Sequence, residues 1–121
     1  MQLLNDIFII KGMQVNDDRA QATGTLNPSH PVFAAHFPGR PVLPGVCQVR
    51  LATELLRVME GKHLRLTSAK NIKYTGLITP QISPLDVFFS NIVRTDNGID
   101  CLVVFKSDSE VFSKMSLSYC L

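Results

Sequence analysis

Apolar and polar residues alternate near the start of the chain, and the pattern then becomes helical. Residues 7–15 and 19–26 alternate in the manner of two strands, with a polar turn at 16–18 between them. From 44 to about 59, apolar residues recur on most of the helical circumference, which predicts a helix buried on nearly all sides. Gly61, just beyond, can take the positive φ that ends a helix.

The second half of the chain has the pattern of successive strands. An irregularity is expected near 68–69, and two prolines predict a loop over 79–84. The Asn-Gly pair at 97–98 is a strong hairpin signal. The order strand, strand, helix, four strands predicts an α+β domain with an antiparallel meander. The four later strands are expected over 64–75, 85–94, 99–107 and 110–120.

Composition adds an expectation about assembly. The 121 residues suit a single domain, 1–121, and 45% of them are hydrophobic against 18% charged. A small domain has a large surface for its volume, so this surplus of apolar residues suggests a face buried against another subunit or around an apolar ligand. We therefore expect a homodimer or a higher oligomer.

Charge and cysteine content exclude several classes of protein. The net charge of +2 comes from scattered Lys and Arg, without the basic stripe of a nucleic-acid-binding protein. No apolar run reaches a transmembrane length, and the first residues lack the positive region of a signal peptide. The three cysteines are far apart and show no metal-ligand spacing. The simplest expectation is a reduced cytoplasmic protein with no membrane insertion and no metal.

The stretch 36–45, His-Phe-Pro-Gly-Arg-Pro-Val-Leu-Pro-Gly, is the most informative in the chain. Its three prolines exclude a helix or a central strand and predict a stiff loop. The loop carries His36, the side chain type best suited to proton transfer near neutral pH. It runs directly into the start of the predicted helix, where backbone N–H groups lack intrahelical partners. A rigid loop that presents a histidine beside a helix N-terminus is a candidate site for chemistry.

This stretch resembles the signature of the 3-hydroxyacyl-[acyl carrier protein] dehydratases, and the match is dense over 31–46. The resemblance implies a hot-dog fold, in which an antiparallel sheet wraps around one long central helix. It implies reversible dehydration of a 3-hydroxyacyl thioester to a trans-2-enoyl thioester in fatty acid or related acyl-chain synthesis. The substrate would be held on a phosphopantetheine arm of an acyl carrier protein or of CoA, with no further cofactor.

The resemblance also implies roles for individual residues. His36 would be the base that removes the α-proton, because its pKa lies near the working pH. The backbone N–H of Gly45 would donate a hydrogen bond to the thioester carbonyl and stabilise the enolate-like charge. Phe37, Pro44 and Val46 are expected to contact the substrate.

Arg50 departs from the family, which carries an acidic residue fourteen positions after the histidine. Arginine stays protonated and cannot cycle a proton near pH 7. Three interpretations stay open: a weak or silent homologue, a substitute acid, or an arginine that binds an anionic part of the substrate. Glu54, one helical turn on, is the obvious substitute acid, and its alternative role is an ordinary ion pair with Arg50. Gln48 can bind a substrate but cannot transfer a proton.

Three functions therefore remain. The first is a 3-hydroxyacyl-ACP dehydratase with His36, Gly45 and Glu54 as catalytic residues. The second is a catalytically degenerate subunit that binds an acyl carrier or pairs with an active paralogue, which supplies the acid. The third is an acyl thioesterase on the same fold, which Arg50 does not favour because attack of water on a thioester also needs a carboxylate or a base.

Overall fold

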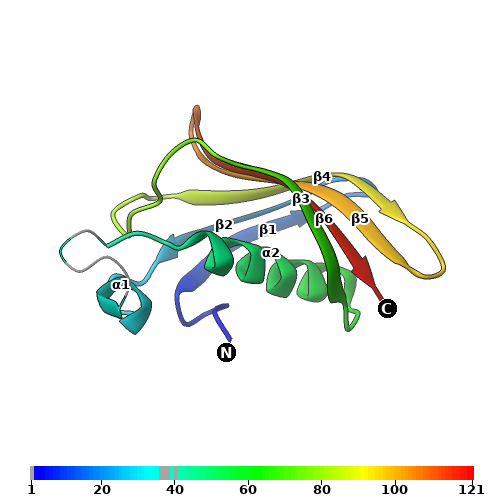
Figure 1. Ribbon diagram of the computed structural model, residues 1–121, viewed down its shortest axis with the longest axis horizontal. Helices are drawn as coiled ribbons and strands as arrows, with labels where there is room; N and C mark the ends of the chain where they lie inside the picture. Colours follow the sequence, from blue (N-terminus) through cyan, green and yellow to red (C-terminus); the bar gives the residue numbers. More distant parts are fainter. Residues whose placement is uncertain (1, 36–38, 40) are drawn as a thin grey trace.

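The chain folds into one curved antiparallel sheet with a long helix along its concave side (Figure 1). This computed structural model describes residues 2–35, 39 and 41–121. The first half holds β1 (Phe8–Val15), β2 (Ala20–Leu26), the short helix α1 (Pro31–Ala35) and the long helix α2 (Gly45–Glu60). The second half holds β3 (Arg65–Tyr74), β4 (Leu85–Arg94), β5 (Gly98–Ser107) and β6 (Glu110–Cys120). The predicted order of elements is confirmed.

The six strands lie in the order β1-β2-β4-β5-β6-β3. β4, β5 and β6 form the predicted meander, and the Asn97-Gly98 turn joins β4 to β5. β2 pairs with β4, so the N-terminal hairpin extends the sheet at one side, while β3 pairs with β6 at the other. β1 and β3 are therefore the two edge strands, and an open edge is a surface on which another chain can pair.

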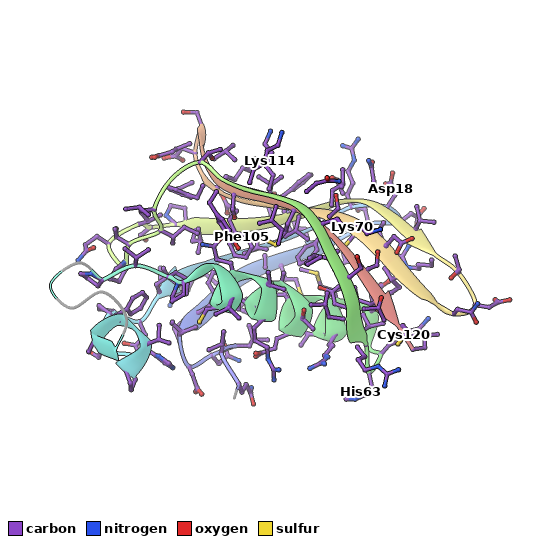
Figure 2. The ribbon with its side chains drawn as sticks, viewed as in Figure 1. Asp18, His63, Lys70, Phe105, Lys114 and Cys120 are labelled. Atoms are coloured by element: carbon purple, nitrogen blue, oxygen red, sulfur yellow. The ribbon has the colours of Figure 1, made fainter. Side chains whose placement is uncertain are left out.

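The core lies between α2 and the concave face of the sheet. One face of α2 buries Leu51, Leu55 and Leu56 completely. Alternate residues of the strands meet them, since successive side chains point to opposite faces of a sheet. In Figure 2, Phe105 lies on the side of the sheet that faces α2, whereas Lys114 lies on the opposite side. The sheet contributes Ala22, Val87, Phe89, Val103, Phe105, Met115 and Leu117 to this core.

The prediction that α2 is buried on nearly all sides needs a correction. The helix is buried over most of its circumference, but Val46 is 76% exposed and Val58 and Arg50 are exposed as well. The apolar pattern is wider than the sheet can cover in a single chain, so α2 keeps an open stripe. The helix ends as expected, with Gly61 at φ 63° and its N–H donated to the carbonyl of Arg57.

β3 is irregular at two places rather than one. The expected irregularity is confirmed as a shift of register between Leu66 and Ser68. A second shift lies between Lys70 and Lys73, at Asn71, which adopts φ 54°. Most of β3 is exposed, on the face toward α2 as well as on the outer face. No helix within the described part of the chain is both long and apolar enough to cross a membrane.

Candidate functional site

A pocket of about 200 Å³ opens at the N-terminal end of α2. One wall is the end of the proline loop and the first turn of α2, and the other is the chain that leaves β3. The lining is mainly apolar, and no carboxylate is among the described residues that form it. Its residues are Val42, Leu43, Pro44, Gly45, Gln48, Tyr74, Gly76, Leu77 and Ile78.

The start of α2 is held in place by backbone hydrogen bonds. The N–H of Leu43 donates to the carbonyl of Ile78 at 2.8 Å, which ties the two pocket walls together. Pro44 is the N-cap, with extended backbone, and its carbonyl accepts the N–H groups of Cys47 and Gln48. Gly45 is the first helical residue, where an amide has no intrahelical acceptor. Two of the predicted site residues, Pro44 and Gly45, thus lie in the pocket wall.

Gln48 also lines the pocket, but its side chain is bonded to protein. Its Nε2 donates to the carbonyl of Leu43 at 3.2 Å, and its Oε1 accepts the hydroxyl of Ser113 at 2.6 Å. The residue is only 3% exposed. Gln48 therefore links the end of the proline loop to β6 and shapes the pocket. The contact with substrate that the sequence predicted for Gln48 stays a prediction.

Glu54 lies in a different environment from the pocket. Its carboxylate accepts the backbone N–H groups of Leu3 and Leu4 at 2.9 Å and the Nε of Arg50 at 2.9 Å. The ion pair with Arg50 that the spacing predicted is confirmed. Because both oxygens are engaged, Glu54 anchors the N-terminal segment to α2. Its catalytic role stays a prediction, since a proton donor would have to leave these partners.

Arg50 lies on the exposed stripe of α2, with 44% of its side chain accessible. It lines a second hollow, of about 360 Å³, between α2 and β3, together with Arg57 and Arg65. Val46, the remaining predicted contact residue, lines this second hollow rather than the first. Position 50, which carries an acid in the 3-hydroxyacyl-[acyl carrier protein] dehydratases, therefore lies on an open, basic surface in this chain.

His36 and Phe37 fall outside the described residues, so their predicted roles have no geometry here. The other two histidines lie elsewhere. His30 accepts the N–H of Val32 at its Nδ1 at 3.1 Å, at the start of α1, and His63 is exposed after α2. Within residues 2–35, 39 and 41–121, no group of three or more His, Cys, Asp or Glu side chains could hold a metal ion.

Sequence reasoning did not single out Tyr74, which ends β3 and lines the pocket beside Gly45. The residue reads as an ordinary strand tyrosine, because nothing in the alternation of the chain reveals the second register shift in β3. The nearest signal is Asn71, a residue type that tolerates positive φ and so permits an irregularity within a strand.

The chain is similar to dehydratases in sequence. The profile of the ApeI-like family, described as ApeI dehydratase, matches residues 12–86. A stretch of 58 residues is 38% identical to the 3-hydroxyacyl-[acyl-carrier-protein] dehydratases FabZ of Rickettsia bellii (strain OSU 85-389) and Rickettsia africae (strain ESF-5). This stretch covers 46% of the chain and only 40% of the length of each curated relative.

Solved structures share the fold. The dehydratase heterocomplex ApeI:P from Xenorhabdus doucetiae matches with a TM-score of 0.75 at 18% identity, over 94% of this chain and 98% of that one. An uncharacterized protein from Erwinia carotovora subsp. atroseptica has a TM-score of 0.63 at 18% identity, over 93% and 94% of the two chains. AziG from S. sahachiroi has a TM-score of 0.63 at 12% identity, over 93% and 89%. The predicted hot-dog fold is confirmed.

Proposed function

The chain belongs to the ApeI-like dehydratase family, and we propose that it serves the reversible dehydration of a 3-hydroxyacyl thioester to a trans-2-enoyl thioester. The observation that carries this proposal is the apolar pocket at the N-terminus of α2. Gly45 forms its wall, and the proline loop that bears His36 leads directly to it. An apolar pocket with few polar groups suits an acyl chain on a phosphopantetheine arm, whether acyl carrier protein or CoA supplies it.

In this proposal His36 acts on the α-carbon of the substrate, and Gly45 acts on the thioester carbonyl oxygen. The imidazole of His36 removes the α-proton, and the electron pair moves onto the thioester carbonyl oxygen. The N–H of Gly45 donates a hydrogen bond to that oxygen, where the negative charge develops. Phe37 and Pro44 would contact the substrate around this centre, whereas Val46 lines the second hollow. The β-hydroxyl then needs a proton donor to leave as water.

A chain acting alone has no evident proton donor for the β-hydroxyl among its described residues. The carboxylate of Glu54 is bonded to Leu3, Leu4 and Arg50, and Arg50 cannot donate a proton near pH 7. We therefore propose, as a second step, that a partner subunit supplies the acid. ApeI:P from Xenorhabdus doucetiae, which shares this fold, is a dehydratase heterocomplex and so is a precedent for two different chains in one assembly.

The charges beside the pocket favour a partner with acidic side chains. Arg50, Arg57 and Arg65 line one hollow between α2 and the edge strand β3. Arg50 already pairs with Glu54, so carboxylates on the facing surface would complement chiefly the positive charges of Arg57 and Arg65, whereas like charges brought together destabilise an interface. The homodimer expected from composition stays a prediction, and an active paralogue with an acid on its helix fits the hollow better.

The experiment is an assay of the hydration of a crotonyl thioester. We expect the purified chain alone to be slow, and a co-purified active paralogue to raise the rate. His36→Ala in this chain should then lower the rate of the mixed assembly by about 10²–10⁴-fold, the usual contribution of a general base. Unchanged rates in His36→Ala, alone and in the mixture, would refute the role of this chain in the reaction.

A further inference from the structure

Gly45 and Tyr74 occupy complementary space. A Cβ atom on Gly45 would lie 2.6 Å from Cζ and 3.1 Å from Cε1 of Tyr74, and closer still to its hydroxyl oxygen. Gly45 does not have the positive φ that demands glycine, which Gly39 and Gly61 do have. A side chain at position 45 would therefore require the phenol ring of Tyr74 to move, because the hydroxyl rests against the first residue of α2.

The second register shift in β3 points Tyr74 toward α2. Residues 70 and 74 would share one face of a regular strand, since side chains repeat every two residues. Across the shift, Lys70 pairs with Ser116 while Tyr74 pairs with Ser113, so Lys70 and Tyr74 lie on opposite faces. Ser113 is fully buried and bonds Gln48 of α2, which identifies its face as the one toward the helix. Bulges commonly re-aim a side chain beside a functional site.

The backbone around Tyr74 is held on both sides. Its partner Ser113 is linked through Gln48 to the carbonyl of Leu43, at the end of the proline loop. Directly after Tyr74, the N–H of Thr75 donates to the carbonyl of Phe112 at 2.8 Å, and the Thr75 hydroxyl donates to the carbonyl of Val111 at 2.7 Å. The backbone of Tyr74 is thus held beside Gly45, and the residue is 53% exposed and borders the pocket.

We propose that Tyr74 is a substrate-contacting residue of this pocket, whose hydroxyl donates a hydrogen bond to the thioester carbonyl oxygen beside the Gly45 amide. The inference rests on the proposed function, because it takes the Gly45 amide as the binding point of that oxygen. A hydroxyl and an amide on one oxygen form a pair of donors of the kind that stabilises an enolate-like charge. The ring, in turn, forms the wall against which the thioester arm lies.

The test measures the affinity of the full chain for crotonyl-CoA, with CoA alone as the reference ligand. Tyr74→Phe keeps the ring and should lower the affinity for crotonyl-CoA about 3- to 10-fold, which corresponds to the loss of one neutral hydrogen bond. The melting temperature should stay unchanged. Tyr119→Phe is the matched control, because the Tyr119 hydroxyl is bonded to Thr53 and lies outside the pocket, and this variant should bind crotonyl-CoA as the wild type does.

A second pair of variants separates contact from packing. Gly45→Ala should displace the Tyr74 ring, lower the melting temperature and weaken binding. Adding Tyr74→Ala makes room for the new methyl group, so the double variant should recover the melting temperature but not the affinity. Recovery of wild-type affinity in the double variant, or wild-type affinity in Tyr74→Phe, would overturn the inference alone. A wild-type chain that binds crotonyl-CoA no better than CoA would overturn the proposed function and this inference together.

Discussion

At the scale of single residues, Glu54 shows how one carboxylate can be committed to structure. It is almost fully buried, and it takes two backbone N–H groups from a segment about fifty positions away along with the guanidinium of Arg50. Charged acceptors make stronger hydrogen bonds than neutral ones, and buried donors that lose their partner pay the full cost of desolvation. The N-terminal segment, with Leu3 and Ile7 completely buried, is held on α2 by these bonds.

Glu54→Ala should therefore lower the free energy of unfolding by about 3 kcal/mol, since it leaves the amides of Leu3 and Leu4 buried without an acceptor. Chemical denaturation measures the change. Glu110→Ala, at the exposed first position of β6, is the control and should stay within about 0.5 kcal/mol of the wild type. A Glu54→Ala protein of wild-type stability that has lost thioester hydration would instead support the catalytic role of Glu54.

The cysteines give a second expectation at this scale. Burial, assisted by the Asp100 carboxylate, raises the pKa of Cys101 to about 12, and burial also raises the pKa of Cys47. Only the thiolate reacts with disulfide reagents, so both thiols should be inert at pH 8. Cys120 is partly exposed and should react in the native protein. The measurement is the number of thiols that react with a disulfide reagent in the native protein and after unfolding. Fast reaction of Cys101 in the native protein would contradict its burial.

At the scale of elements, α2 joins two surfaces of different character. Its N-terminus forms the apolar pocket, and its open stripe presents Arg50 to the hollow beside β3. Arg50 departs from the family at the position where an acid is expected on the helix. Because a guanidinium holds its proton far above neutral pH, the helix as it stands lacks a proton donor on this stripe.

Arg50→Glu should raise the rate of crotonyl thioester hydration by the chain alone, because it supplies a carboxylate at the family's acid position. The gain of a general acid is typically about 10²-fold or more. Arg50→Gln is the matched control: both variants lose the ion pair with Glu54, and only one gains an acid. Equal rates in the two variants would place position 50 away from the reacting groups.

At the scale of the whole molecule, an uncovered surface lies between α2 and the edge strand β3. β3 is an edge strand whose helix-facing residues, among them Leu66 and Tyr74, are exposed beside the open stripe of α2. Exposed apolar positions next to an unpaired strand edge are typical of a surface buried by another subunit. We therefore assign part of the exposed apolar surface of the chain to a subunit interface on this face.

Light scattering at micromolar concentration should give at least about twice the chain mass of 13.4 kDa. Leu66→Asp should shift the protein toward the monomer, because a charge would be buried at the edge of β3. Val93→Asp, at an exposed position on β4 away from that edge, should leave the mass unchanged. A wild-type chain that stays a soluble monomer at these concentrations would contradict the assignment of this face.

The sequence by itself determined the elements and their order. Alternation with period two and the helical period are local properties, so the strands, α2, the Gly61 cap and the Asn97-Gly98 turn followed from neighbouring residues alone. The hot-dog fold was implied by the resemblance of the motif over 31–46 to a known family, whereas the pattern alone indicated only an α+β domain with a meander. The i, i+4 ion pair of Arg50 and Glu54 was also readable, because helical spacing places them together.

Only the tertiary structure decided which distant groups meet. The amides of Leu3 and Leu4 reach Glu54 from 51 and 50 positions away in the sequence, and no local pattern records that contact. Tyr74 faces Gly45 because a register shift in β3 changes the face of every residue that follows it. Periodicity predicts which face a regular strand buries, whereas one inserted residue reverses that face, and the folded sheet alone shows where the insertion lies.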